Sequence, residues 1–118
     1  LSVCVYQLRD PNTFKQLTED IDGLYKLLEC GAFDPSVANA RRVIVNPGKV
    51  QKVAIDRADG AKFVAIVAGY YTIDKAKIVR FYRIPQESRG FFSKSMVPLP
   101  LEKTIKLGPK QITTSQEE

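Results

Sequence analysis

Residues Val3–Phe14 join two local signals that together restrict the fold: a stretch with β-strand character leads directly into a helix start. Val5 and Tyr6 favour an extended strand, because β-branched and aromatic side chains pack well on a pleated surface. Asp10 is a typical N-cap and Pro11 a typical first helical residue, since proline lacks the N–H that has no helical partner there. The chain is therefore predicted to begin with a strand that is followed by a short helical turn.

A second helix is predicted after Asp20, whose side chain is of the kind that caps helix N-termini. The apolar residues that follow recur at helical spacing, and these are Ile21, Leu24, Tyr25 and Leu28. We expect them to form one face that docks on the rest of the protein. Gly31 is a typical helix stop, and residues 31–40 are expected to be a loop. The helical insertion is thus assigned to about residues 11–38.

From Arg42 onward the pattern changes to that of β-strands separated by turns. The predicted strands are residues 43–45, 50–56, 62–71, 78–84 and 101–107. Pro47-Gly48 suits a type II turn, and Asp59-Gly60 predicts a second turn. The nearly all-apolar strand 62–71 is expected to be central and buried.

Several short strands with one helical excursion indicate a mainly β fold of the β-sandwich type. We expect a single domain over residues 1–110 and a disordered tail over residues 111–118. The longest apolar run is too short for a membrane-spanning helix, which needs about 20 residues.

The composition argues against catalysis and against nucleic-acid binding. The net charge of +5 comes from 18 Lys and Arg against 13 Asp and Glu, but the basic residues are scattered along the chain. Solvated strand faces and loop tips explain such scatter better than a nucleic-acid surface does. The chain has no histidine, no P-loop and no GxGxxG motif, and its aspartates lie at expected caps and turns. We therefore expect no enzyme activity, no metal and no cofactor.

Three motifs, in this order along the chain, resemble one known family. The segment VYQLRDPNTF, Val5–Phe14, resembles the VYQL-(K/R)-D/S-x-x-F signature of the TssJ family, the outer-membrane lipoproteins of type VI secretion systems. Residues 46–56 resemble the family's x-P-G-x hairpin. Residues 62–84 resemble its apolar strand ending in A-x-Y, its acidic turn and its basic return strand. The residues that carry this last motif are Ala68, Tyr70, Asp74, Lys75 and Ala76.

The resemblance implies a transthyretin-like β-sandwich with a small helical insertion after the first strand of the chain. Leu1 would then lie in the family's second strand, downstream of a loop that is a main contact to the partner protein TssM. Ile78 or Phe81 would fill the core space of the family's usual tryptophan, which this chain lacks.

The same resemblance implies a non-catalytic structural role. The protein would anchor the secretion complex at the periplasmic face of the outer membrane, through a lipidated cysteine upstream of Leu1. It would bind the periplasmic C-terminal domain of TssM, and it would bind no nucleic acid and no small-molecule substrate.

A periplasmic setting with only two cysteines predicts a disulfide between Cys4 and Cys30. Such a bond would tie the first strand to the helical insertion.

Successive loops of a sandwich alternate between its two ends, and this alternation predicts where the partner binds. The helical insertion and the turn at Asp59-Gly60 are assigned to the far end. The residues that would flank the partner-binding loop at the first end are Asn46, Gly48, Lys49, Tyr71, Thr72, Asp74 and Lys75. Tyr71 would be an anchor, since tyrosine is enriched in protein interfaces. The alternatives are a free-standing transthyretin-like extracytoplasmic module that binds a ligand, and a basic nucleic-acid module.

Overall fold

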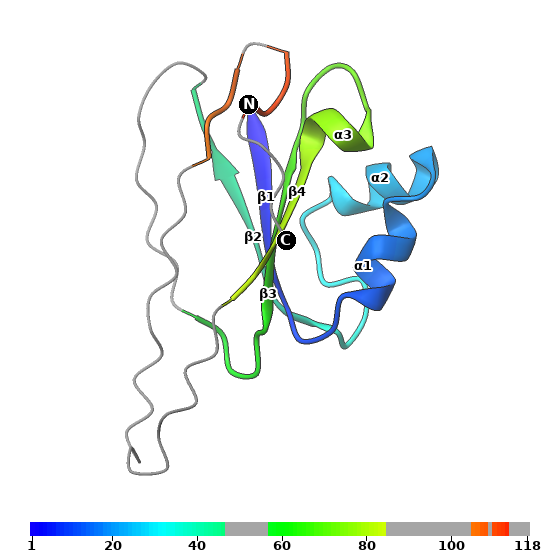
Figure 1. Cartoon of the computed structure of the whole chain (residues 1–118), viewed down its shortest axis with the longest axis vertical. Helices are drawn as coiled ribbons and strands as arrows, with labels where there is room; N and C mark the ends of the chain where they lie inside the picture. The colour runs from blue at the N-terminus through cyan, green and yellow to red at the C-terminus, as the bar shows by residue number, and fades with distance from the viewer. Residues whose placement is uncertain (47–56, 85–104, 109, 114–118) are drawn as a thin grey trace.

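The computed structural model describes residues 1–46, 57–84, 105–108 and 110–113, so the return strand predicted over residues 50–56 lies outside the described residues. In chain order the elements are β1 (Ser2–Leu8), α1 (Asn12–Leu17), α2 (Ile21–Leu27), β2 (Val37–Ile44), β3 (Phe63–Ala68), α3 (Lys75–Ile78) and β4 (Val79–Arg83). The strands form one antiparallel sheet, and α1 and α2 cover one of its faces (Figure 1). The predicted mainly β class is confirmed, and the sheet is compatible with one layer of a sandwich.

The order of strands in the sheet is β2-β1-β3-β4, so β1 and β3 occupy the inner positions. β1 pairs with β2 from Ser2 opposite Ile44, and with β3 from Val3 opposite Ala68. The prediction of a central buried strand after Lys62 is confirmed by β3, whose last four residues are all buried. The strand is shorter than predicted, because it ends at Ala68.

The sheet has a first end, where β1 begins, and a far end, where β1 ends. At the first end, where β1 begins, the Val45 N–H donates to the Leu1 carbonyl and the Gly69 N–H donates to the Ser2 carbonyl, both at 2.8 Å. At the far end, where β1 ends, β3 is entered through the predicted turn, in which Gly60 has a φ of 80°. Glycine suits that position because side chains disfavour positive φ.

Aromatic rings fill the space between the sheet and the helical insertion. The Tyr6 ring lies 5.9 Å from Phe14 and 5.6 Å from Phe33, and Phe14 lies 5.8 Å from Phe81, measured between ring centroids. The Tyr6 hydroxyl donates a hydrogen bond to the Leu27 carbonyl of α2. Burial raises the pKa of Tyr6 to about 12. A strand side chain thus holds the end of α2 directly.

The prediction of which residues of α2 face the core is wrong in part. Leu24 is buried and Leu28 is half-buried, as expected, but Leu27 is fully buried as well. Ile21 and Tyr25 are 53% and 56% exposed. At 100° per residue, the buried face is rotated by roughly 80° from the predicted one.

Close approach of the two helices explains this rotation. A Cβ atom on Gly23 would lie 1.9 Å from the carbonyl oxygen of Leu17 in α1, so only glycine fits there. The Gly23 N–H also donates to the Asp20 carboxylate at 2.7 Å, which confirms the predicted N-cap. Because Gly23 faces α1, the leucines beside it turn inward and the opposite side of α2 turns to solvent.

A disulfide joins Cys4 of β1 to Cys30, which follows α2, and the two Cα atoms are 5.0 Å apart. Cys4 is only 1% exposed, so the bond lies in the core and ties the helical insertion to the sheet. Cys30 itself takes the left-handed conformation, with a φ of 58°. The helix itself ends at Leu27, so the expected stop at Gly31 lies too late in the chain.

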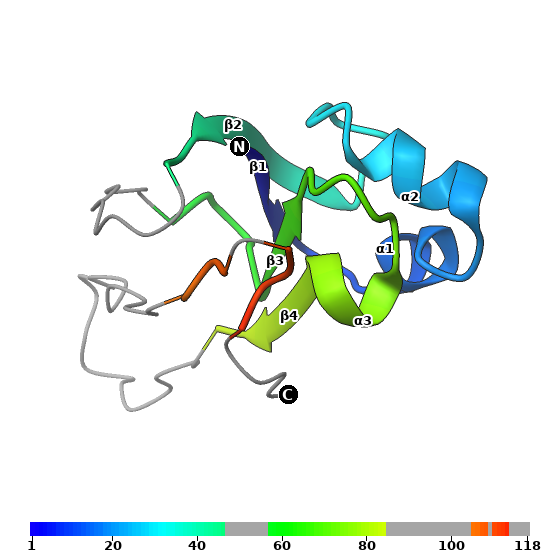
Figure 2. The ribbon, with the colours of Figure 1, turned by 90° about the horizontal axis from the view of Figure 1, so that it is seen from above.

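The other face of the sheet is covered in part by residues 105–108 and 110–113, which lie across the sheet from α1 and α2 (Figure 2). The Ile112 N–H donates to the Lys77 carbonyl at 2.9 Å, and the Ile112 carbonyl accepts from the Arg80 guanidinium at 3.0 Å. Ile112 is fully buried and also bridges Leu107. The prediction of a disordered tail from residue 111 therefore places its start too early, because Ile112 is a core residue.

Two further element boundaries differ from the predictions. β2 begins at Val37 rather than near residue 43, so the helical insertion ends earlier than expected. Pairing with β1 explains this, because backbone hydrogen bonds extend a strand through residues of low β propensity. The predicted turn after β3 contains α3, and Ile78 belongs to this helix instead of the return strand. Ile78 and Phe81 are both buried, as expected for residues that fill the core.

Candidate partner-binding site

The loop that joins β3 to α3 presents one tyrosine to the core and the next to solvent. Tyr70 is 6% exposed, and its hydroxyl donates to the Gly108 carbonyl at 2.8 Å. Burial raises the pKa of Tyr70 above its usual range. Tyr71 is fully exposed. The buried ring thus fixes the backbone from which its neighbour projects.

Charged residues continue this loop into α3. The Asp74 carboxylate accepts from the Ala76 N–H at 3.0 Å, so Asp74 is the N-cap of α3 and has a structural role of its own. The Lys75 ammonium lies 3.7 Å from the Glu19 carboxylate, and both side chains are more than half exposed. This lysine therefore stays accessible to a partner.

A hollow of about 310 Å³ lies beside the exposed tyrosine. Its lining residues are Tyr70, Tyr71, Thr72 and Lys110. An aromatic ring next to a small cavity and a lysine is suited to contact another protein, because tyrosine offers a large apolar surface with one polar tip. The sequence analysis did not predict Lys110 as a site residue, since no local pattern shows that this residue lies close to Tyr70.

The structure brings the predicted partner-binding residues within the described ranges to one end of the sheet, whereas Gly48 and Lys49 lie outside those ranges. Asn46 is exposed and follows Val45, which bonds to the first residue of the chain. The loop with Tyr71 follows Gly69, which bonds to the second. Asn46 and this loop therefore flank the start of β1 at the first end.

The prediction that places the helical insertion at the far end is correct only for its points of attachment. The insertion leaves after β1 and returns where the Arg9 N–H donates to the Ser36 carbonyl at 2.8 Å. Between these points it crosses the face of the sheet and reaches the first end, where Glu19 meets Lys75. The physical reason is that the insertion buries its apolar face along the strands, so it spans the length of the sheet.

Within the described ranges, no group of three or more His, Cys, Asp or Glu residues is arranged to hold a metal ion. In the same ranges, no helix has both the length and the apolar character that a membrane crossing needs.

Comparison with known proteins matches the chain to a protein family and to a solved structure. The family model described as "Type VI secretion lipoprotein, VasD, EvfM, TssJ" matches residues 1–110. The fold resembles that of Serratia marcescens Lip, described as a membrane-bound component of the type VI secretion system, with 20% sequence identity and a TM-score of 0.67. This match covers 94% of the present chain and 79% of Lip. No curated protein matches the chain.

Proposed function

Because this chain belongs to the type VI secretion lipoprotein family, we propose that it anchors the secretion complex by binding the periplasmic C-terminal domain of TssM. The match over residues 1–110 carries this proposal. In the proposed arrangement a lipid anchor upstream of Leu1 holds the protein at the periplasmic face of the outer membrane. The role is structural, and no reaction is catalysed.

The first end of the sheet supports this proposal with a surface of suitable chemistry. The fully exposed ring of Tyr71 adjoins the 310 Å³ hollow, so a partner side chain that enters the hollow also covers the ring. Aromatic anchors of this kind commonly contribute much of the binding free energy of an interface. The lysines beside it, Lys75 and Lys110, favour an acidic rim on the partner, which mainly accelerates association.

Anchoring gains strength from repetition. When several copies are tethered around one assembly, each further contact forms at a high effective concentration. A modest affinity at each Tyr71 surface is then sufficient to hold the complex.

Replacement of Tyr71 by serine tests the anchor, with binding to the purified periplasmic domain of TssM measured by surface plasmon resonance. We expect a loss of about 2 kcal/mol, or about 30-fold in Kd, as is typical of an interface hot spot. Tyr25→Ser is the matched control, because Tyr25 is also an exposed tyrosine but lies on α2. Equal affinity of the two variants would contradict the assignment.

A pair of charge reversals tests the rim. Lys75→Glu should slow association, because rim charges act on the on-rate. Lys26→Glu is a close control, since Lys26 lies 3.7 Å from Glu29 just as Lys75 lies 3.7 Å from Glu19. Unchanged association of Lys75→Glu, together with loss of binding when the turn 57–60 is altered, would move the site to the far end.

A further inference from the structure

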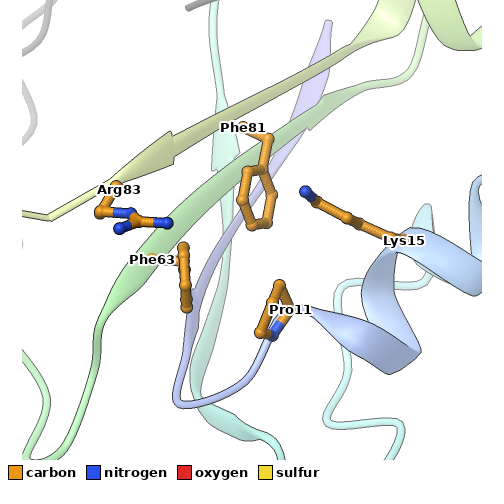
Figure 3. A pocket seen from close by; sticks show the side chains of 5 residues that line it. All are labelled: Pro11, Lys15, Phe63, Phe81 and Arg83. Carbon is orange, nitrogen blue, oxygen red and sulfur yellow. The ribbon is translucent and has the colours of Figure 1, made fainter. Parts of the chain in front are cut away.

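A second hollow lies at the far end of the sheet, on the face that carries the helices. Its walls are the rings of Phe63 in β3 and Phe81 in β4, whose centroids are 5.2 Å apart with an angle of 29° between the planes. Pro11 and Lys15 from the start of the helical insertion and Arg83 of β4 complete the lining (Figure 3). The hollow has a volume of about 400 Å³.

Two cations flank the pair of rings from opposite sides (Figure 3). The Lys15 ammonium lies 4.7 Å from the centroid of the Phe81 ring, and the Arg83 guanidinium carbon lies 5.6 Å from that of Phe63. These positions suit cation–π attraction, which holds both cations at the rim of the hollow. Both side chains are exposed to solvent.

We propose that this hollow binds a protein segment in which an aromatic side chain stands between acidic residues. The half-buried rings of Phe63 and Pro11 offer apolar walls, against which another ring packs favourably. The cations on either side match carboxylates before and after that ring. The volume lies near the small end of ligand pockets, about 300–1,000 Å³, so it admits one large side chain.

The shape of the hollow favours such a segment over a membrane surface. Proteins that bind anionic bilayers usually present clusters of about four to eight basic residues together with outward apolar side chains. Here two cations flank the rings, and the Phe81 ring is only 8% exposed. A flat lipid surface cannot reach such a ring, whereas one projecting side chain can.

This surface is separate from the one proposed to bind TssM. Phe63 pairs with Leu8 at the far end of β1, whereas Ala68 pairs with Val3 near the first end. Five residue steps along β3 separate these positions by roughly 17 Å. The two surfaces therefore permit two partners, or two segments of one partner, to bind at once.

The test is a titration of the ¹⁵N-labelled chain with the peptide acetyl-Gly-Asp-Phe-Glu-Gly-amide, followed by NMR. Shift changes are expected at Lys15, Phe63, Phe81 and Arg83, and none at Tyr71. A peptide with Asn and Gln in place of the acids, or with Ala in place of Phe, should bind at least about fivefold more weakly, given the strength of exposed ion pairs. Absence of shifts at these residues, or equal binding of the neutral peptide, would overturn the proposal.

A charge-matched pair of variants completes the test. Lys15→Gln with Arg83→Gln should weaken peptide binding roughly fivefold, whereas Lys26→Gln with Arg41→Gln, which removes the same charge elsewhere, should leave it unchanged. Thermal midpoints are recorded for both, so that a loss of fold is recognised. Equal weakening by both variants would reduce the effect to net charge. Binding to phosphatidylglycerol vesicles that requires Lys15 and Arg83, without binding of the peptide, would instead assign the site to lipid.

Discussion

Gly23→Ala tests the contact that sets the orientation of α2. In an exposed helix, replacement of glycine by alanine gains about 1 kcal/mol of stability, because glycine loses more backbone entropy on folding. At Gly23 the added Cβ atom would lie 1.9 Å from the Leu17 carbonyl oxygen, and 2.7 and 2.8 Å from the carbonyl carbon and Cα of the same residue. All three atoms belong to the backbone of α1, so no side-chain rotation relieves the clash.

The size of the effect follows from this geometry. A Cβ contact needs about 3.0 Å, so α2 must move away from α1 by more than 1 Å. Such a shift disturbs the buried Leu24 and Leu27 and the hydrogen bond that Tyr6 donates to α2. Overpacking typically costs about 3 kcal/mol in an unyielding site, and the helix propensity returns about 1 kcal/mol. We therefore expect Gly23→Ala to lower the free energy of unfolding by about 2 kcal/mol.

The assay is the thermal midpoint measured by circular dichroism. For 118 residues, the entropy of unfolding is about 250 cal/mol/K, so the expected decrease is about 8 °C. Gly31→Ala is the matched control, because Gly31 is exposed and a Cβ atom there would meet nothing within 4 Å. Its midpoint should stay within about 2 °C of the wild type. A midpoint of Gly23→Ala at or above that of the wild type would refute the close approach of the helices.

Three further predictions concern the core. Reduction of the Cys4–Cys30 bond should lower the free energy of unfolding by about 3.5 kcal/mol, since the bond spans 26 residues. The thermal midpoint should then fall by about 14 °C when a phosphine reductant is added. A shift of only a few degrees between scans with and without the reductant would contradict this. The pKa of about 12 for Tyr6 exceeds the unfolded value of about 10, so the free energy of unfolding should fall as the pH rises from 10 to 12. Urea titrations at several pH values should show that Tyr6→Phe removes the part of this fall that is due to Tyr6. Ile112→Ala should cost about 2–4 kcal/mol by urea unfolding, whereas no change would mean that Ile112 is not part of the core.

The elements whose signals are local could be predicted from the sequence. Alternation and turn chemistry act within a few residues, so β1, the capped start of α2 and the turn at Gly60 were found. The alternation of loops also predicted that Asn46 and Tyr71 lie at the same end of the sheet. The first inference needs only neighbouring residues, and the second needs only the direction of the chain after each turn.

Contacts between distant segments decided the rest. The inward side of α2 depends on the approach of Gly23 to Leu17, and helical spacing alone does not distinguish this face from its neighbour. The burial of Ile112 depends on hydrogen bonds to Lys77 and Arg80, more than 30 positions earlier. Lys110 was missed at the candidate site for the same reason, since a polar stretch near the end of a chain carries no local sign of its partners.

The helical insertion contributes to both proposed surfaces, and this links their geometry. At the first end its Glu19 pairs with Lys75, beside the loop that presents the exposed tyrosine. At the far end its Pro11 and Lys15 line the second hollow. Because the disulfide and the Tyr6 hydrogen bond fix the insertion to β1 between these points, it is held as one body against the sheet. A change that loosens the insertion should therefore disturb both surfaces together, even though β3 separates them.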